Sequence, residues 1–150
     1  MPPRPRSPES CFACDRIQSI KQGKNPYFVK ELSESYLVLE DHQPTLGWCI
    51  LLLKDHHEHL GELSKKRAER LFRDVFWTAA AIKKTLKPVR INYECLGNTL
   101  HHIHWHIIPR HKNDPTPLLP VWLWGKKKLA GKAVSPASRR RLITLLRGVF

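Results

Sequence analysis

The chain has 150 residues, of which 26 are Lys or Arg and 13 are Asp or Glu, so its formal net charge is +13 with histidine neutral. This length favours one domain, because domains usually hold roughly 100–200 residues, and a hydrophobic content of 41% excludes wholesale disorder. The longest apolar run, residues 48–53, is far shorter than the roughly 18 residues of a membrane helix. Because the first residues also lack the apolar region of a signal peptide, we expect a soluble cytoplasmic protein. In such a compartment, its four cysteines are expected to be free thiols or metal ligands in preference to disulfides.

The positive charge is concentrated in the last part of the chain. Residues 115–150 contain no acidic residue, whereas their basic residues are Lys126, Lys127, Lys128, Lys132, Arg139, Arg140, Arg141 and Arg147. Such a field attracts polyanions, which include nucleotides, polyphosphates and nucleic acids. A solvated basic surface that aids solubility would explain the same pattern, so the charge alone does not choose between the two interpretations.

The first half of the chain predicts a tail, a short helical segment and three strands. Residues 1–10 contain four prolines and no periodic apolar pattern, which predicts a disordered tail. Residues 11–24 indicate a short turn or helix that enters the fold. Aromatic, β-branched or apolar runs predict strands at residues 27–30, 36–40 and 48–53.

The strongest helix signal runs from Ser64 to Leu86, where apolar residues recur every three or four positions. Ser64 is a suitable N-cap, and Pro88 ends the run. After the helix, strands are predicted at residues 89–95 and 100–108, the second closed by Pro109, and a further short helix at residues 139–150. Strands, one long helix and further strands predict an α+β fold with a mainly antiparallel sheet.

The most informative segment contains three histidines that alternate with apolar residues. His102, His104 and His106 would share one face of a strand, about 7 Å apart, and Ile103, Trp105 and Ile107 would face the core. Imidazoles in this arrangement can ligate a metal, or supply a nucleophile and acid–base groups. The alternation with apolar residues favours a shaped strand over a set of ordinary surface histidines.

The segment His102-Ile-His-Trp-His-Ile-Ile108 fits the pattern His-φ-His-φ-His-φ-φ, in which φ is apolar, and resembles the histidine triad (HIT) family of nucleotide hydrolases and transferases. Pro109-Arg110 after the triad resembles the bacterial members that are similar to diadenosine polyphosphate hydrolases. The resemblance covers roughly residues 11–125, which we take as the HIT domain, and leaves residues 126–150 as a basic extension with a short helix. It implies a five-stranded, mainly antiparallel sheet with one long and one short helix, and a homodimer.

The resemblance also implies a mechanism. His104, the middle histidine, matches the nucleophile of the family, which forms a covalent nucleotidyl-histidine intermediate, and His106 would donate to the phosphate or leaving group. The chemistry is sound because a neutral imidazole is a good nucleophile at pH 7 and a good leaving group from phosphorus. The other ring nitrogen of His104 would need an acceptor, such as a backbone carbonyl, to fix its tautomer.

Five further residues lie at or near positions where relatives hold the substrate. Asn98, Thr99 and Asn92 would hold phosphate, although Asn and Thr also stabilise turns and the register of Asn92 is open. Either Glu40 or Asp41 would accept hydrogen bonds from the ribose hydroxyls, and the sequence does not decide which of the two faces the ribose.

A metal site is predicted from Cys11-Phe-Ala-Cys14, because two thiolates at this spacing can bind one Zn²⁺. The resemblance supplies two histidines that would complete a structural Cys₂His₂ zinc site. One is His102, and the other is His56 ahead of the long helix, with the alternatives His57 and His59 left open. Two buried free cysteines would explain the pair without a metal.

The sequence suggests three alternative functions. The first is a nucleotide hydrolase or transferase that cleaves the α-phosphate linkage of a dinucleoside polyphosphate, a phosphoramidate or a related nucleotidyl conjugate. The second is a nucleic-acid-directed HIT enzyme that removes nucleotidyl groups from DNA or RNA ends, which the basic extension favours. The third is a zinc-stabilised nucleotide-binding module without turnover, against which the intact triad argues.

Overall fold

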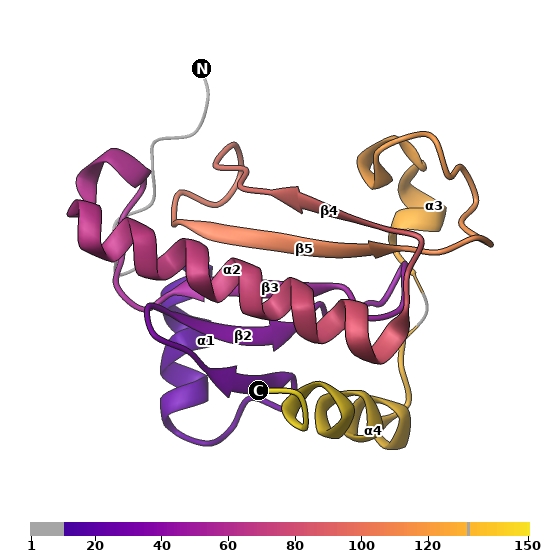
Figure 1. Ribbon diagram of the computed structural model, residues 1–150, viewed down its shortest axis with the longest axis horizontal. Coiled ribbons are helices and arrows are strands. Elements are labelled where there is room, and N and C mark those ends of the chain that lie inside the picture. The colour runs from indigo at the N-terminus through magenta and orange to yellow at the C-terminus, as the bar shows by residue number, and fades with distance from the viewer. Residues whose placement is uncertain (1–10, 132) are drawn as a thin grey trace.

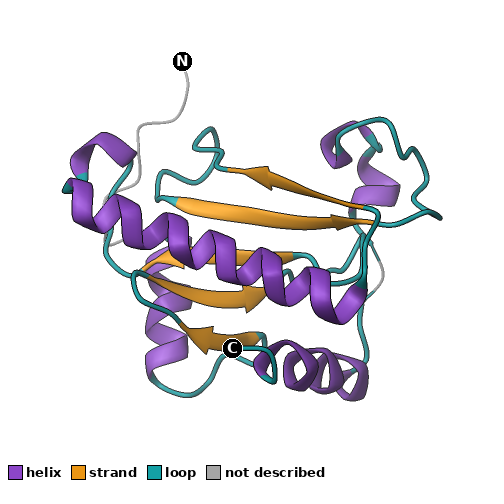
Figure 2. Cartoon of the chain, viewed as in Figure 1, coloured by secondary structure: helices purple, strands orange, loops and turns teal. Residues whose placement is uncertain are grey.

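The computed structural model describes residues 11–131 and 133–150, so the predicted tail at residues 1–10 lies outside the described residues. A five-stranded sheet with the strand order β1-β2-β3-β5-β4 forms the centre of the molecule (Figures 1 and 2). The strands are β1 (Phe28–Glu31), β2 (Ser35–Leu39), β3 (Cys49–Leu53), β4 (Arg90–Glu94) and β5 (His104–Arg110). All neighbouring strands are antiparallel, which confirms the predicted α+β class and sheet.

Four α-helices occur among the described residues, where the resemblance implied one long and one short helix. They are α1 (Phe12–Lys21), α2 (Lys65–Leu86), α3 (Lys126–Leu129) and α4 (Pro136–Arg147), with short 3₁₀ turns η2 (Leu60–Glu62) and η3 (Val121–Leu123). α2 is the predicted long helix, and the side chain of Ser64 caps it by accepting a hydrogen bond from the backbone N–H of Arg67. Within residues 11–131 and 133–150, no helix has both the length and the apolar character to cross a membrane.

The sheet is covered on both faces, with α2 in front and α1 behind in Figure 1. Every residue of β2 and β3 is buried, because successive side chains pack alternately toward the two helical layers. Leu37 and Leu51 belong to the core beneath α2, whereas Val38, Ile50 and Leu52 belong to the core beneath α1. The short apolar runs of the sequence are therefore central strands that are covered on both sides.

The basic extension contributes to the core. Leu142, Ile143 and Leu146 of α4 are buried in the cluster that includes β1, β2 and α2. The helix was predicted to begin at residue 139 but begins at Pro136, because Ser135 caps it and proline suits the first helical turn. Residues 136–147 are therefore an integral layer of the fold at the β1 edge of the sheet.

The predicted strand at residues 100–108 is displaced toward the C-terminus. β5 begins at His104 and continues through Pro109 to Arg110. Pro109 is tolerated because its backbone groups face the β3 side of β5 at a position that β3 does not reach, so the missing N–H removes no hydrogen bond of the sheet. The Thr45 hydroxyl donates to the Pro109 carbonyl oxygen at 2.6 Å. His102 consequently precedes the strand, and the three histidines do not share one strand face.

Candidate active site and metal centre

A cavity of about 410 Å³ lies on the α1 side of the sheet, where β2 ends and β5 begins. Six of the residues predicted from the sequence line it: His104, His106, Asn98, Thr99, Glu40 and Asp41. Apolar side chains from α1, β3 and the loop after β4 complete the wall: Phe12, Ile50, Leu52, Leu96 and Leu100. An apolar wall with a few convergent polar groups is typical of a ligand site of this size.

His104 is buried, and its tautomer is fixed by the backbone. Its Nδ1 donates to the carbonyl oxygen of His102 at 2.6 Å, which is the acceptor that the sequence argument required. The proton on Nδ1 leaves Nε2 with a free lone pair. Burial lowers the pKa of His104 below its ordinary value, although the bond to the His102 carbonyl opposes this effect. The ring is therefore a neutral imidazole at pH 7, as a nucleophile must be.

His106 has the complementary arrangement. Its Nδ1 accepts a hydrogen bond from the indole Nε1 of Trp48 at 3.1 Å, so the neutral ring carries its proton on Nε2. Burial, with a smaller contribution from His104, lowers the pKa of His106 to about 4. The rings of His104 and His106 lie edge to face with centroids 5.1 Å apart. One strand therefore offers an acceptor and a donor at the same cavity.

Trp122 also lines this cavity, although no motif in the sequence points to it. Its ring packs edge-on against His106 at a centroid distance of 5.3 Å and against Trp48 at 5.5 Å. Its indole N–H donates to Glu94 of β4. Because Trp122 lies in η3, far from the triad in the sequence, only the folding back of residues 111–125 brings it to the site.

Both carboxylates that the sequence offered as alternatives line the cavity, but their surroundings differ. Asp41 forms an ion pair with Arg16 at 2.6 Å, and Arg16 also donates to the carbonyl oxygen of Leu39 at 3.0 Å. Burial, followed by the charge of Asp41, raises the pKa of Glu40 above its ordinary value. Asp41 is therefore the carboxylate that α1 holds in place by a charged partner.

Asn92 does not line the triad cavity. It lies on β4, and its side-chain oxygen accepts a hydrogen bond from Arg110 at 2.8 Å. Both residues line a separate cavity of about 450 Å³ with the loop at residues 117–120. The β4–β5 register pairs Asn92 with Ile108, beyond His106 along the strand, so the structure does not support its predicted contact with phosphate.

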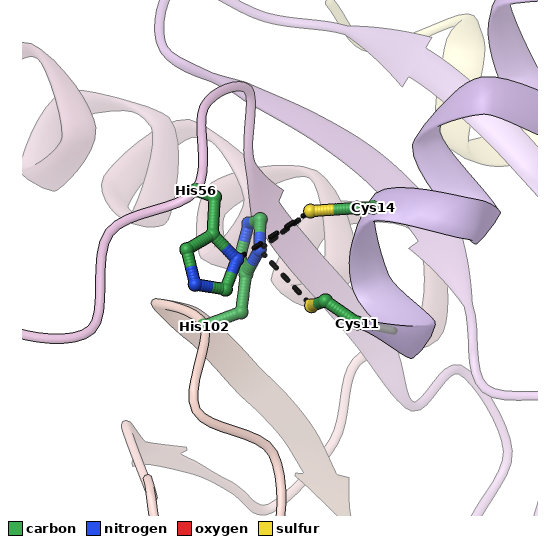
Figure 3. Close-up of side chains that lie close together, drawn as sticks. All are labelled: Cys11, Cys14, His56 and His102. Atoms are coloured by element: carbon green, nitrogen blue, oxygen red, sulfur yellow. Dashed lines mark hydrogen bonds between the residues drawn. The ribbon is translucent and has the colours of Figure 1, made fainter. Parts of the chain in front are cut away.

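Cys11, Cys14, His56 and His102 form a compact group whose potential ligand atoms all lie within 4.8 Å of one another (Figure 3). The Nδ1 atom of His102 lies 3.6 Å from each cysteine sulfur, and that of His56 lies 3.5 Å from the sulfur of Cys14. A tetrahedral Zn²⁺ with ordinary bond lengths places sulfur and nitrogen ligands about 3.6 Å apart. The four residues therefore fit a Cys₂His₂ zinc site.

Three separate segments supply this group. The two cysteines lie one turn apart at the start of α1, so their side chains share a face. The Nε2 of His102 donates to the Leu53 carbonyl at 2.9 Å, which leaves Nδ1 unprotonated for a metal. Of the histidines left open by the sequence, the structure brings His56 to the cysteines, whereas His57 lies 3.3 Å from Glu62.

The protonation of the cysteines depends on a metal. Burial, followed by interaction with Cys11, raises the pKa of the Cys14 thiol to about 11. Without a cation the thiol therefore stays protonated at neutral pH, whereas a bound divalent metal deprotonates such ligands and releases their protons. The group is suited to metal and not to nucleophilic chemistry.

The five-stranded sheet and its histidine pair beside a ligand-sized cavity define an α+β protein of histidine triad architecture. The HIT domain family matches residues 22–113. The chain is 32% identical over 108 residues to "Protein hit" of Bacillus subtilis, and this match covers 69% of this chain and 72% of that protein. The chain therefore belongs to the HIT family.

Solved structures agree with this fold. A histidine triad protein from Sinorhizobium meliloti has a TM-score of 0.74 at 23% identity, with 82% of this chain and 88% of that chain covered. A Zn-bound histidine triad family protein from Mycobacterium smegmatis has a TM-score of 0.68 at 19% identity, with 95% of this chain and 96% of that chain covered. The fold expected from the resemblance is confirmed.

Proposed function

We propose that this HIT protein is a hydrolase or transferase that cleaves the α-phosphate linkage of a nucleotide conjugate through a covalent intermediate on His104. The observation that carries the proposal is the 2.6 Å hydrogen bond from His104 Nδ1 to the His102 carbonyl, because it leaves the lone pair of Nε2 free for attack. Asn98, Thr99 and Asp41 line the same cavity and would hold the phosphate and the ribose.

In the first step, Nε2 of His104 forms a bond to the α-phosphorus and the bond from phosphorus to the leaving group breaks. His106 Nε2–H is placed to donate a hydrogen bond to the leaving oxygen or nitrogen, which stabilises the charge that develops there. In the second step, a water oxygen bonds to phosphorus and releases a proton to the solvent, the phosphorus–nitrogen bond breaks with its electron pair returning to Nε2, and His104 returns to its neutral form. Transfer to another acceptor replaces water by that acceptor.

We further propose that Cys11, Cys14, His56 and His102 hold a structural Zn²⁺. Four protein ligands leave no open position for a substrate, so the ion would supply rigidity and no chemistry. His102 connects it to the reaction only through position, because its own carbonyl holds the Nδ1 proton of His104. The free thiols fit a reducing compartment such as the cytoplasm, where we place the protein.

The substrate class favoured by the residues is a dinucleoside polyphosphate, as in the hydrolase-like branch that Pro109-Arg110 resembles. The test is a panel of diadenosine triphosphate, diadenosine tetraphosphate, adenosine phosphoramidate and 5′-adenylated DNA, with products separated by chromatography. The adenylylated protein should be detected by mass spectrometry of acid-quenched samples and should be absent from His104→Ala. Binding of AMP without cleavage of any member of the panel would identify a binding module instead.

A second candidate function is the removal of nucleotidyl groups from nucleic acid ends. The observation that favours it is the position of Arg16, which lines the triad cavity and contacts the ring of Tyr27, as Arg139 of α4 also does. Preferential cleavage of 5′-adenylated DNA in the same panel would select this function over the small-molecule reaction.

A further inference from the structure

A further cavity, of about 400 Å³, lies between α1 and α4 at the β1 edge of the sheet. The C-terminal end of α1, the loop that follows it and one face of α4 form its walls. Ile20 and Phe28 provide an apolar floor, Gly23 and Asn25 lie at the loop, and Arg140 and Arg147 project from α4. We call this feature the α1–α4 groove. It uses none of the residues assigned to the triad or to the metal group.

The two segments that form the groove carry positive charge and no acidic residue. Residues 16–30 contain Arg16, Lys21, Lys24 and Lys30 without an Asp or Glu, and α4 contains Arg139, Arg140, Arg141 and Arg147. The next acidic residue along the chain, Glu31, forms an ion pair with Lys54 at 2.7 Å. Because Arg16 is paired with Asp41, the positive field comes from the lysines of the first segment and the arginines of α4, and the sequence alone could not show that the two segments meet.

Several of these cations are held in place by the fold. The guanidinium of Arg139 lies over the ring of Tyr27 at 4.7 Å. That of Arg147 donates to the backbone carbonyls of Phe28 and Val29 on the edge strand β1. Arg140 is exposed and, among the described residues, makes no side-chain hydrogen bond or ion pair. Of the two arginines that line the groove, Arg147 is therefore held by the edge strand and Arg140 is available to a ligand.

Tyr27 links the groove to the triad cavity. Arg16 contacts its ring at 5.6 Å, as Arg139 does, and Arg16 also lines the cavity of His104. The ring of Tyr27 therefore contacts one cation of α4 and one cation, Arg16, whose charge is paired with Asp41 at the triad cavity. A small nucleotide in the triad cavity would not need the cations of α4.

We propose that the α1–α4 groove binds the sugar–phosphate backbone of a single-stranded nucleic acid. The two arginines of α4 that line the groove, the exposed Lys24 of the adjoining loop and an apolar, aromatic floor match the repeated phosphates and the bases of such a chain. A volume of about 400 Å³ is at the small end of ligand-sized cavities, which suits one strand better than a duplex. Binding here is independent of turnover at His104, so it can be tested whatever the reaction proves to be.

The test is fluorescence anisotropy of a labelled oligothymidylate, titrated with the full chain at several salt concentrations. The variant is Lys24→Gln with Arg140→Gln. Its matched control is Lys65→Gln with Lys66→Gln, which has the same net charge and changes residues at the start of α2 that do not line the groove. Each phosphate contact to a single strand contributes about 0.7 to the slope of log K against log salt. We expect the groove variant to lower that slope by about 1.4 and the affinity on the order of tenfold near 0.1 M salt.

The control variant and His104→Ala should bind the oligonucleotide as the wild type does. Equal losses in the groove variant and the control would overturn the proposal, because they would mean diffuse attraction to a positively charged protein. Loss of binding in His104→Ala would also overturn it by assigning the strand to the triad cavity. Sedimentation with phosphatidylserine vesicles is the third arm, and binding to vesicles without binding to the oligonucleotide would assign the groove to a membrane surface. Circular dichroism of each variant checks that the surface substitutions leave the fold intact.

Discussion

Two histidines on one strand hold opposite hydrogen-bonding roles because their partners differ. The carbonyl of His102 accepts from Nδ1 of His104 at 2.6 Å, and the indole of Trp48 donates to Nδ1 of His106 at 3.1 Å. A carbonyl can only accept and an indole can only donate, so each partner dictates the tautomer of the ring it contacts. The chemical difference between identical side chains thus comes from residues that the triad pattern does not contain.

The role of His104 leads to the first prediction. His104→Ala should reduce kcat on the best substrate on the order of 10³-fold or more, because a covalent catalyst loses its nucleophile. Nucleotide binding should remain measurable, since Asn98, Thr99 and Asp41 still line the cavity. Steady-state kinetics and calorimetric titration with AMP check the two parts. His106→Ala should lose less activity, and near wild-type turnover of His104→Ala would show that the assigned roles are wrong.

The environment of His106 predicts a pH dependence of stability. Burial lowers its folded pKa to about 4, whereas the unfolded value is near 6.5. Between these values the unfolded chain binds more protons than the folded one, so stability falls as pH falls. In urea titrations, His106→Gln should lose less stability than the wild type between pH 7 and 5, by up to about 2 kcal/mol. Parallel curves for the two proteins across this range would contradict the assignment.

At the scale of secondary structure, three elements meet at the cysteine–histidine group. The start of α1 supplies the cysteines, the segment after β3 supplies His56, and the approach to β5 supplies His102 (Figure 3). His102 is also joined to Leu53 at the end of β3. A metal here would therefore fix α1 over the sheet and, through His102, fix the first residue of the catalytic strand.

We predict about one Zn²⁺ per purified chain. Cys11→Ser, Cys14→Ser and His102→Ala should each lose metal and stability together, because the ligands join separate segments. The loss should be on the order of 4 kcal/mol when free zinc exceeds its Kd a thousandfold. Elemental analysis and thermal unfolding are the measurements. His57→Ala, which lies outside the group, should retain the metal. If elemental analysis finds no zinc in freshly purified wild-type protein, the proposed site is wrong.

Arg110 anchors the segment that carries Trp122 to the end of β5. It is buried, pairs with the buried Asp114 at 2.7 Å, and donates to Asn92 and to the Thr116 carbonyl. Arg110→Met should destabilise the protein by about 3–5 kcal/mol, because it leaves the Asp114 carboxylate buried without its partner. Urea unfolding measures this, and Lys54→Met, which breaks the more exposed pair with Glu31, should cost less than about 1 kcal/mol. Equal costs would mean that Arg110 is no special anchor.

At the scale of the whole molecule, α2 leaves an aromatic surface uncovered. Phe72, Phe76 and Trp77 expose 51%, 62% and 57% of their surface, although the opposite side of the helix is buried against the sheet. Contiguous apolar surface of this kind commonly marks a protein interface. Together with the homodimer implied by the family resemblance, it favours a two-fold contact through α2.

We therefore expect a homodimer at micromolar concentration, measured by light scattering coupled to size exclusion. Phe76→Lys with Trp77→Lys should give a monomer, because a two-fold contact presents each new charge to its own copy. Leu145→Lys, at an exposed apolar position of α4, is the control and should remain dimeric. A wild-type protein that elutes only as a monomer would contradict the expected dimer.

Local patterns in the sequence were enough to predict several elements and candidate residues. Apolar residues that recur about every 3.6 positions identified α2, whereas short continuous apolar runs identified the central strands β2 and β3. The triad motif pointed to His104 and His106, and the spacing of Cys11 and Cys14 indicated a metal pair. Each of these signals lies within a few neighbouring residues, where chain geometry fixes which side chains share a face.

The relations between distant segments became clear from the folded chain and not from the sequence. It brought His56, and not His57, to the cysteines; it placed Trp122 over His106 and directed Asn92 to Arg110. It also moved His102 out of β5, and it joined α4 to the basic loop after α1. These outcomes depend on sheet order, strand register and the return path of the chain, which arise from packing across the whole core and leave no periodic trace in the sequence.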